Sequence, residues 1–414
     1  MGMTMTKHFW AGVAALTLAT PGCATPRTQP AALKLDRVVL LMRHGVRPPT
    51  KNPPMAAGVT SDPWPSWDVA PGYLTSHGAK AIMLVGAFDR QVLTAGLLGA
   101  GCPKPGAVSV YSDSGQRPVA SGDAWIAGFA PGCHIVNQHK PRDVDDPIFS
   151  PLGDASLGYD PAKADAAVKA GLGAGGIAAV EQAQAGVLKR LDAIYCGPTA
   201  AGNCGFSGKP SQLEVPRAGK KPGFSGALDL GSTAGQILLL EYADGKPMSD
   251  VGWGRATKAD IALAGRLHAV EYSVLARPIY VAASNAALFA PKMLAALTDP
   301  DAATVSMIVG HDTQLAAIGG LLDFHWQVAG FAADDPSPGE AIGFELLRDA
   351  SGQRFVRAVL RAQGLDQIRD LTPLTARSPA TVVTLPIKGC DAPDACPLDR
   401  FVALVEERLN VNTQ

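Results

Sequence analysis

Two short polar motifs contain the residue types that could perform chemistry in this 414-residue chain. The first reads Arg-His-Gly-Val-Arg-Pro-Pro over residues 43–49, and the second reads Gly-His-Asp-Thr over residues 310–313. The first motif places a guanidinium group on each side of a histidine. Arginine presents a planar fork of N–H donors, which binds phosphate or carboxylate oxygens in bidentate fashion. The first motif therefore predicts a site for an anionic ligand.

His44 lies between Arg43 and Arg47, and their charges affect its ionisation. Nearby positive charge disfavours the imidazolium, so we expect a lowered pKa for His44. A neutral imidazole keeps the lone pair with which it can attack phosphorus and form a phosphohistidine. The arginines would neutralise oxygens in the transition state, and Gly45 would let the backbone approach the ligand closely.

Asp312 supplies a proton donor, which the first motif lacks. A departing alkoxide needs a proton, and a carboxylic acid beside the site can give it. The same group could then take a proton from the water that hydrolyses the intermediate. Two alternatives stay open at this point. Asp312 could cap a helix, and the arginines around His44 could belong to a structural ion-pair cluster.

Both motifs follow apolar runs that are typical of buried strands, over residues 35–42 and 304–309. Ligands of open α/β sheets bind beyond the carboxyl ends of strands, so we expect both motifs at one edge of a sheet. Further strands are expected at 107–111, 133–136, 344–347, 355–361 and 381–385, and helices at 75–98, 117–130, 176–195, 233–242, 258–275, 282–297 and 313–322.

The composition changes over residues 140–232, where Gly, Ala, Ser and Pro dominate. We expect an α/β fold with a mixed central sheet flanked by helices and an inserted, mainly helical cap subdomain. Residues 25–140 and 261–414 would form the α/β catalytic domain, and residues 141–260 the cap. The site would lie in the cleft between the two.

Residues 1–24 predict an export signal, because Lys7 precedes a short apolar stretch that ends in small residues. Cys23 could carry a lipid anchor, and simple cleavage near Ala24 is the alternative. The chain would then be periplasmic or secreted. No uninterrupted apolar run reaches 18 residues, so we expect no membrane span.

Six of the seven cysteines remain after such a leader is removed, and they form sequence-local pairs. Fifteen connectivities are possible for six cysteines, and reduced cysteines are a further alternative. Export to an oxidising compartment favours disulfides, and the absence of metal-ligand spacings argues against a metal site. We therefore expect the pairs Cys102/Cys133, Cys196/Cys204 and Cys390/Cys396.

The charge balance excludes one class of partner. Lys and Arg total 36, Asp and Glu total 37, and the net charge is −1. Nucleic-acid binders need surplus cations to displace counterions, so we expect no nucleic-acid partner. Hydrophobic residues make up 47%, which is enough for a large core.

The string RHGxRxP followed by GHDT resembles the histidine acid phosphatases, which are branch 2 of the histidine phosphatase superfamily. The resemblance extends over nearly the whole mature chain and is nearest to the bacterial periplasmic phytases. Residues 47–51, the Trp64/Trp67 loop, residues 252–255 and the three cysteine pairs carry it. It implies a phosphoglycerate mutase-like fold, a monomer without a cofactor, and metal-independent hydrolysis of small phosphomonoesters in acid.

The resemblance also assigns roles to single residues. His44 is similar to the family's nucleophile and Asp312 to its proton donor, while Arg43, Arg47, Arg117 and His311 resemble its phosphate pocket. Thr50, Lys51 and Thr313 would contact the substrate. The chain departs from the family at two positions. Gln314 follows GHDT where Asn is common, and Gln236 stands where related phytases tend to carry a glutamate near the substrate.

Phytate is the expected substrate, because Thr50 and Lys51 would add contacts beyond the phosphate pocket. A sugar-phosphate phosphatase similar to periplasmic glucose-1-phosphatases is the alternative enzyme. A non-catalytic phosphate-ester binding lipoprotein, anchored through Cys23, is the alternative from another class. We expect Trp64 and Trp67 to pack a loop, and Arg255 to stack on Trp253 or play a structural part.

Overall fold

The computed structural model describes residues 1–2 and 33–412, apart from 61, 199–203, 215 and 393. Apart from Met1 and Gly2, the expected export signal lies outside the described residues, as does Cys23. Residues 33–414 cluster as one unit, separate from residues 1–32.

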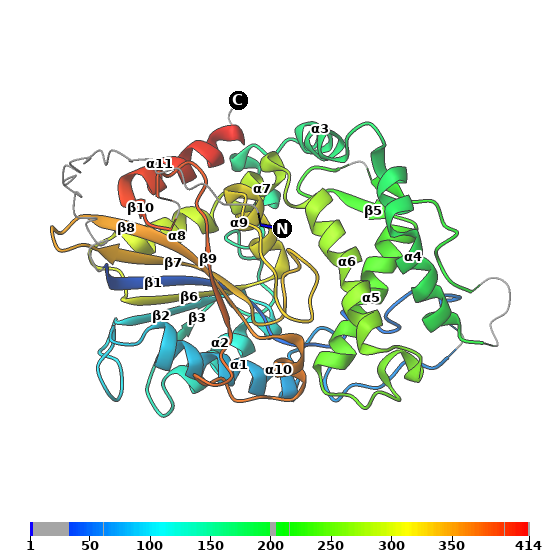
Figure 1. Ribbon diagram of the computed structural model, residues 1–414, viewed down its shortest axis with the longest axis horizontal. Coiled ribbons are helices and arrows are strands. Elements are labelled where there is room, and N and C mark those ends of the chain that lie inside the picture. The colour runs from blue at the N-terminus through cyan, green and yellow to red at the C-terminus, as the bar shows by residue number, and fades with distance from the viewer. Residues whose placement is uncertain (3–32, 61, 199–203, 215, 393, 413–414) are drawn as a thin grey trace. The chain divides into compact units, whose positions relative to one another are not determined.

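The unit is built on a mixed sheet of eight strands (Figure 1). Its order is β10-β8-β7-β1-β6-β2-β3, with β9 paired to β8. The strands are β1 (Lys34–Arg43), β2 (Val108–Ser112), β3 (Asn137–Gln138), β6 (Val305–Gly310), β7 (Ala341–Arg348), β8 (Arg354–Ala362), β9 (Thr381–Leu385) and β10 (Cys396–Pro397). Strands β1, β6, β2 and β3 run parallel, and the rest pair in antiparallel fashion. The expected mixed sheet is confirmed.

The register of the parallel strands brings the two sequence motifs together. Strand β1 pairs with β6 so that Arg43 lies opposite Gly310. Strand β2 pairs with β6 on its other side, with Ser112 opposite Val309. The three carboxyl ends therefore meet at one edge of the sheet, and the residues that follow them are neighbours.

Helices cover both faces of the sheet (Figure 1), because the side chains of the central strands alternate between two apolar cores. Val38 and Leu40 pack with residues of α1 (Ser76–Phe88) and α2 (Gln116–Phe129). Val39 and Leu41 belong to the larger core on the other face. Helices α7 (Ile279–Ala286), α8 (Phe289–Thr298), α9 (Asp312–Leu322) and α11 (Leu398–Leu409) contribute to that core.

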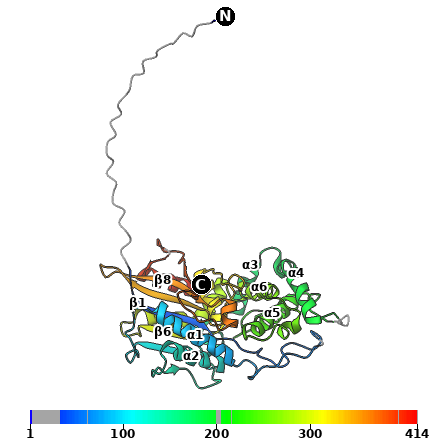
Figure 2. The same ribbon diagram turned by 60° about the horizontal axis from the view of Figure 1, so that its bottom comes forward.

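A second group of elements lies beside the sheet in both views (Figures 1 and 2). It contains α3 (Pro161–Leu172), α4 (Gly176–Cys196), α5 (Ala227–Ala243), α6 (Lys258–Leu275) and a hairpin of β4 (Gln212–Glu214) and β5 (Gly223–Ser225). The short helix α10 (Leu365–Arg369) follows β8 in the chain. The expected division at residues 141 and 260 stays a prediction.

Several expected boundaries are wrong. The helix expected to reach residue 98 ends at Phe88, where a π-helical turn over Asp89–Leu93 begins, because Asp89 is buried and bonded to Arg361 and Trp125. The helix expected at 282–297 is two helices, α7 and α8, which meet at 64°. The strand expected at 133–136 forms instead at residues 137–138.

The three expected disulfides are present. They join Cys102 to Cys133, Cys196 to Cys204, and Cys390 to Cys396. No single helix among the described residues is both long and apolar enough to cross a bilayer; only the bent pair of α7 and α8 meets that test when taken together.

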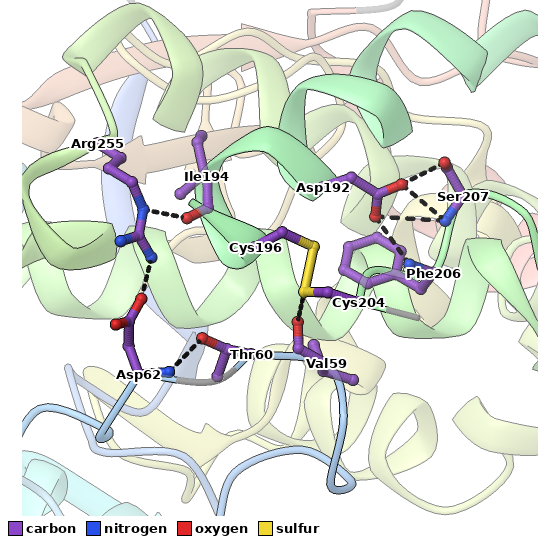
Figure 3. Close-up of a disulfide and its surroundings, with 10 residues drawn as sticks. All are labelled: Val59, Thr60, Asp62, Asp192, Ile194, Cys196, Cys204, Phe206, Ser207 and Arg255. Atoms are coloured by element: carbon purple, nitrogen blue, oxygen red, sulfur yellow. Dashed lines mark hydrogen bonds and ion pairs between the residues drawn. A yellow bond between two sulfur atoms is a disulfide. The ribbon is translucent and has the colours of Figure 1, made fainter. Parts of the chain in front are cut away.

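The long loop that follows the first motif is anchored to the end of α4 (Figure 3). Arg255 donates to the carbonyl of Ile194 at 2.5 Å and forms an ion pair with Asp62 at 2.8 Å. The Sγ of Cys204 lies 3.1 Å from the carbonyl oxygen of Val59. These contacts connect the sheet side of the molecule to the helical group.

The aromatic residues of this loop pack as expected. The rings of Trp64 and Trp253 lie 5.3 Å apart, and Lys246 lies 4.2 Å from the ring centre of Trp67. The guanidinium of Arg255 lies 5.0 Å from the ring centre of Trp253, which confirms the expected stacking.

Candidate active site

The ends of two strands, β1 and β6, supply the centre of the site. Arg43 ends β1 and His44 follows it. His311 and Asp312 follow β6, and Asp312 begins α9. The ring centres of His44 and His311 lie 5.4 Å apart. The structure thus brings together the two motifs, which are separated by more than 260 residues in the sequence.

His44 is held with one ring nitrogen available as a base. Its Nδ1 lies 2.8 Å from the carbonyl oxygen of Gly45, and its Nε2 accepts a hydrogen bond from Nε of Arg117 at 2.9 Å. Because a guanidinium can only donate, this network assigns the imidazole proton to Nδ1 and the lone pair to Nε2. Burial lowers the pKa of His44 well below its usual value, and the charge of Arg117 adds to the effect. The expected direction of the shift is confirmed.

Gly45 is also required for packing. A Cβ at this position would lie 2.9 Å from Ile82 Cγ1 and 2.9 Å from Leu74 Cδ1. The backbone nitrogen of Gly45 is bonded to Oγ of Ser121 at 3.0 Å. The missing side chain therefore lets the motif pack tightly against α1, and this packing fixes the position of His44.

Arg43 is buried behind the site, with 1% of its surface exposed. One terminal nitrogen lies 3.0 Å from Oδ2 of Asp312 and 3.3 Å from Oε1 of Gln236. The other donates to the carbonyl of Pro336. An anion that enters the site must therefore compete with Asp312 for this guanidinium.

Asp312 forms an ion pair with Arg43. Burial acts to raise its pKa, but the charge of Arg43 and further interactions with His268, His44 and Tyr272 hold the pKa well below its usual range. Its Oδ1 also accepts the backbone N–H of Thr313 at 2.9 Å, within the first turn of α9. The N-cap of α9 is His311, so the alternative that Asp312 caps the helix is wrong, and Asp312 is the first residue of the helix.

Arg117 and His311 continue the network across the site. The Nη2 of Arg117 lies 3.3 Å from Nδ1 of His311, and Nε2 of His311 lies 2.6 Å from Oδ2 of Asp113. Burial acts to raise the pKa of Asp113, but the hydrogen bond and charge of His311, the backbone N–H of Ser114 and the charge of Arg117 together lower it below its usual value. Asp113 was not predicted from the sequence, although its place directly after β2 is a usable signal.

Arg47 has unused hydrogen-bonding capacity. It donates to the carbonyl of Pro48 at 3.0 Å, and its buried Nε has no acceptor among the residues that the structure describes. Burial lowers the pKa of Arg47 to about 10, helped by the charges of Arg117 and Arg43. The group is still cationic in neutral or acidic solution, so it is available to bind an anion.

These residues open onto a cavity of about 530 Å³, which we call the catalytic cavity. Of the residues expected at the site, it is lined by His44, Arg47, Arg117, His311, Asp312 and Thr313. The other lining residues are Asp145, Phe149, Ser150, Leu152, Gly153, Gly219, Lys220, Lys221, Asn285 and Gln314. Lys220 and Lys221 belong to the hairpin and were not singled out from the sequence.

Thr50 and Lys51 lie outside the lining of the catalytic cavity. Lys51 lines a neighbouring cavity of about 340 Å³ together with Pro48, Trp64 and Trp67. Thr50 is exposed and lies beside Gly72. Within the described part of the chain, no group of three or more His, Cys, Asp or Glu side chains is arranged to hold a metal ion.

Gln236 and Gln314, the two positions expected to differ from the family pattern, both contact residues of the site. Gln236 accepts from Arg43, and its Nε2 is buried without a partner among the described residues. Gln314 accepts from the backbone N–H of His311 at 2.9 Å and donates to the carbonyl of Phe149 at 2.9 Å. Gln314 therefore holds the turn between β6 and α9 in place.

Comparisons with known proteins agree with this geometry. A family model described as histidine phosphatase superfamily (branch 2) matches residues 34–156. The phytase AppA of Escherichia coli (strain K12) is 33% identical over 94% of this chain and 95% of its own length. A glucose-1-phosphatase of Salmonella typhimurium is 29% identical, over 91% of this chain and 92% of its own.

A solved phytase structure is also similar to this chain over nearly its full length. The Hafnia alvei phytase in complex with myo-inositol hexakis sulphate superposes with a TM-score of 0.84 at 33% identity, covering 93% of this chain and 100% of that one. Similarity of this extent, together with the paired motifs at the sheet edge, shows that the chain belongs to branch 2 of the histidine phosphatase superfamily and is a phosphoric monoester hydrolase.

Proposed function

We propose that this chain hydrolyses phosphomonoesters through a phosphohistidine intermediate and that phytate is its favoured substrate. The observation that carries the proposal is the orientation of His44. Its unprotonated Nε2 accepts a hydrogen bond from Arg117. His44, Arg47 and Arg117 all line the catalytic cavity, while Arg43, which precedes His44 in the sequence, is buried. A phosphoryl group bound by these arginines would place its phosphorus within reach of that lone pair.

In the first step, Nε2 of His44 attacks phosphorus, so a P–N bond forms as the P–O bond to the alcohol breaks. The departing oxygen takes a proton from Asp312. Asp312 must be protonated to do this, and its ion pair with Arg43 opposes protonation. The negative substrate would raise the pKa of Asp312, because it attracts Arg43 and adds like charge next to the carboxylate.

In the second step, a water attacks the phosphohistidine and passes its proton to Asp312. The P–N bond breaks, inorganic phosphate leaves, and the imidazole regains its lone pair. His311, bonded to Asp113 and Arg117, would bind a phosphoryl oxygen and keep Arg117 in position. No step needs a metal ion.

The names of the relatives support phytate as the substrate, since the chain covers nearly the full length of phytases from two organisms. Thr313 lines the catalytic cavity, and Thr50 and Lys51 lie in the adjoining loop, where they would contact other parts of the substrate. The glucose-1-phosphatase relatives, 29% and 28% identical, support a sugar-phosphate phosphatase as the second candidate.

We also propose export to the periplasm or medium. The leader-like residues 1–24 and three disulfides support it, because disulfides persist in oxidising compartments. Cys23 would be lipid-anchored or lost by cleavage. The enzyme would act as a monomer, with residues 25–140 and 261–414 as the catalytic domain and residues 141–260 as the cap.

The test is phosphate release from phytate between pH 3 and pH 8 in the presence of EDTA, for the wild type and His44→Ala. We expect release that is greatest in acid, resists EDTA and is lost in the variant. Release from a glucose phosphate alone would replace phytate by the second candidate. A variant that retained wild-type turnover would contradict the histidine mechanism.

A further inference from the structure

Two lysines of the helical group reach the catalytic cavity. Lys220 and Lys221 lie in the connection between β4 and β5, and both side chains are exposed. Both line the same cavity as His44. They come from the connection of a hairpin and not from the strand ends that carry His44 and Asp312.

The backbone that carries these lysines is held in place. Gly219 has a positive φ of 69°, and its backbone packs against the backbone of Leu152 and Gly153. The backbone N–H of Lys220 donates to the carbonyl of Arg217 at 2.9 Å. The hydroxyl of Tyr159 donates to the carbonyl of Lys220 at 3.0 Å. The backbone is thus fixed while the two ammonium groups stay free to meet a ligand.

The charges that line the cavity favour a ligand with more than one anionic group. Arg47, Arg117 and the two lysines contribute four cations, against the carboxylates of Asp145 and Asp312. Asp312 is already paired with Arg43. Neither lysine has an ion-pair partner within the described part of the chain. The arginines next to His44 are placed to bind the phosphoryl group that reacts, which leaves the two lysines available for a further anionic group.

We propose that Lys220 and Lys221 bind a second phosphate of the substrate, remote from the phosphorus that His44 attacks. They would act as specificity residues that favour polyphosphorylated esters over esters with a single phosphate. This inference rests on the proposed function, because it assumes that the reacting phosphate lies beside His44. It extends that function by naming the part of the chain, the β4–β5 hairpin, that would select polyphosphorylated substrates.

The test uses the double variant Lys220→Gln/Lys221→Gln and two readouts. The first is inhibition of p-nitrophenyl phosphate hydrolysis by myo-inositol hexakissulfate, which carries six anionic groups and is not turned over. The second is kcat/KM for p-nitrophenyl phosphate, which has one phosphate. We expect the inhibition constant to rise about tenfold, since two charge-assisted contacts are lost. The kcat/KM of the double variant for p-nitrophenyl phosphate should stay within about twofold of the wild-type value.

A matched control removes two charges from nearby positions that do not line the cavity. Lys209→Gln/Arg217→Gln changes exposed residues on either side of β4 and should leave the inhibition constant near that of the wild type. The proposal is overturned if this control weakens inhibition as much as the test variant. It is also overturned if inhibition is unchanged, if p-nitrophenyl phosphate turnover falls in parallel, or if the wild type is not inhibited.

The test separates this inference from the proposed function. A wild type that does not release phosphate from phytate would remove phytate as the substrate. The inhibition constant of the hexakissulfate would still report whether the two lysines recognise a second anionic group.

Discussion

Nε of Arg117 donates a 2.9 Å hydrogen bond to Nε2 of His44, the atom that we propose as the nucleophile. Without a ligand, this bond occupies the lone pair that would attack phosphorus. An incoming phosphate offers Arg117 a charged acceptor, which binds a guanidinium more strongly than a neutral imidazole does. Substrate binding would thus free Nε2 at the moment when phosphorus arrives.

Arg117→Gln should shift the pH dependence of the reaction. Burial is the main cause of the low pKa of His44, and the charge of Arg117 is the next. Without that charge the pKa of His44 rises, so His44 becomes protonated at a higher pH. The acid limb of the kcat/KM profile therefore moves to higher pH. We also expect kcat/KM to fall about 100-fold, because a transition-state donor is lost. A pH–rate profile with p-nitrophenyl phosphate measures both effects. Arg117→Lys keeps the charge and should keep the acid limb; equal shifts in both variants would contradict this account.

Asp312→Asn should be sensitive to the leaving group. An amide cannot protonate the departing oxygen, so turnover of an inositol or sugar phosphate should fall about 10²–10⁴-fold. Nitrophenolate leaves without a proton, so hydrolysis of p-nitrophenyl phosphate should fall far less. The comparison is kcat for the two substrates. Asp145→Asn, which also changes a carboxylate of the catalytic cavity, should affect both substrates alike. A uniform loss in Asp312→Asn would remove Asp312 from the role of proton donor.

Gln236→Glu should raise the pKa of Asp312. Both side chains lie close to the same terminal nitrogen of Arg43, at 3.3 Å and 3.0 Å. A second carboxylate would share that guanidinium and add like charge near Asp312, which disfavours its ionised form. The basic limb of kcat/KM for a sugar phosphate, whose leaving group needs the proton of Asp312, should move to higher pH, and a pH–rate profile with that substrate measures the shift. Gln236→Met removes the contact without adding charge, so a shift of the same size in Gln236→Met would argue against the electrostatic cause.

Glu340→Gln should make stability less dependent on pH. Glu340 is fully buried and accepts from the backbone and hydroxyl of Ser337. Burial raises its pKa from 4.5 to about 8. The folded state therefore holds a proton that the unfolded state releases, and stability is lost as pH rises from about 4.5 to about 8. Between these two pH values the free energy of unfolding of the wild type should fall by on the order of 3–5 kcal/mol because of this group. The variant should not show that fall.

Urea unfolding of wild type and Glu340→Gln at pH 4.5 and pH 8 measures that difference. Glu406→Gln, which changes an exposed carboxylate of α11, should follow the wild type. If Glu340→Gln lost as much stability as the wild type between these two pH values, the buried carboxyl would not be the cause.

Much of the fold could be predicted because its central strands are unusually clear in the sequence. The apolar runs of β1 and β6 have a single reasonable structure, strands buried on both faces. Helix ends were harder to predict. The end of α1 depends on Asp89, whose partners Arg361 and Trp125 lie on other elements. Helix α3 was missed because its alanine-rich sequence has little apolar periodicity.

The sequence by itself determined the two motifs, the strands that precede them and the class of reaction, since these depend on residue types and local order. The tertiary structure decided which other side chains meet them. Asp113 joins the site because β2 lies parallel to β6, and Lys220 and Lys221 join it because a distant hairpin lies at the same cavity. Such contacts depend on packing between remote segments, and no local spacing in the sequence encodes them.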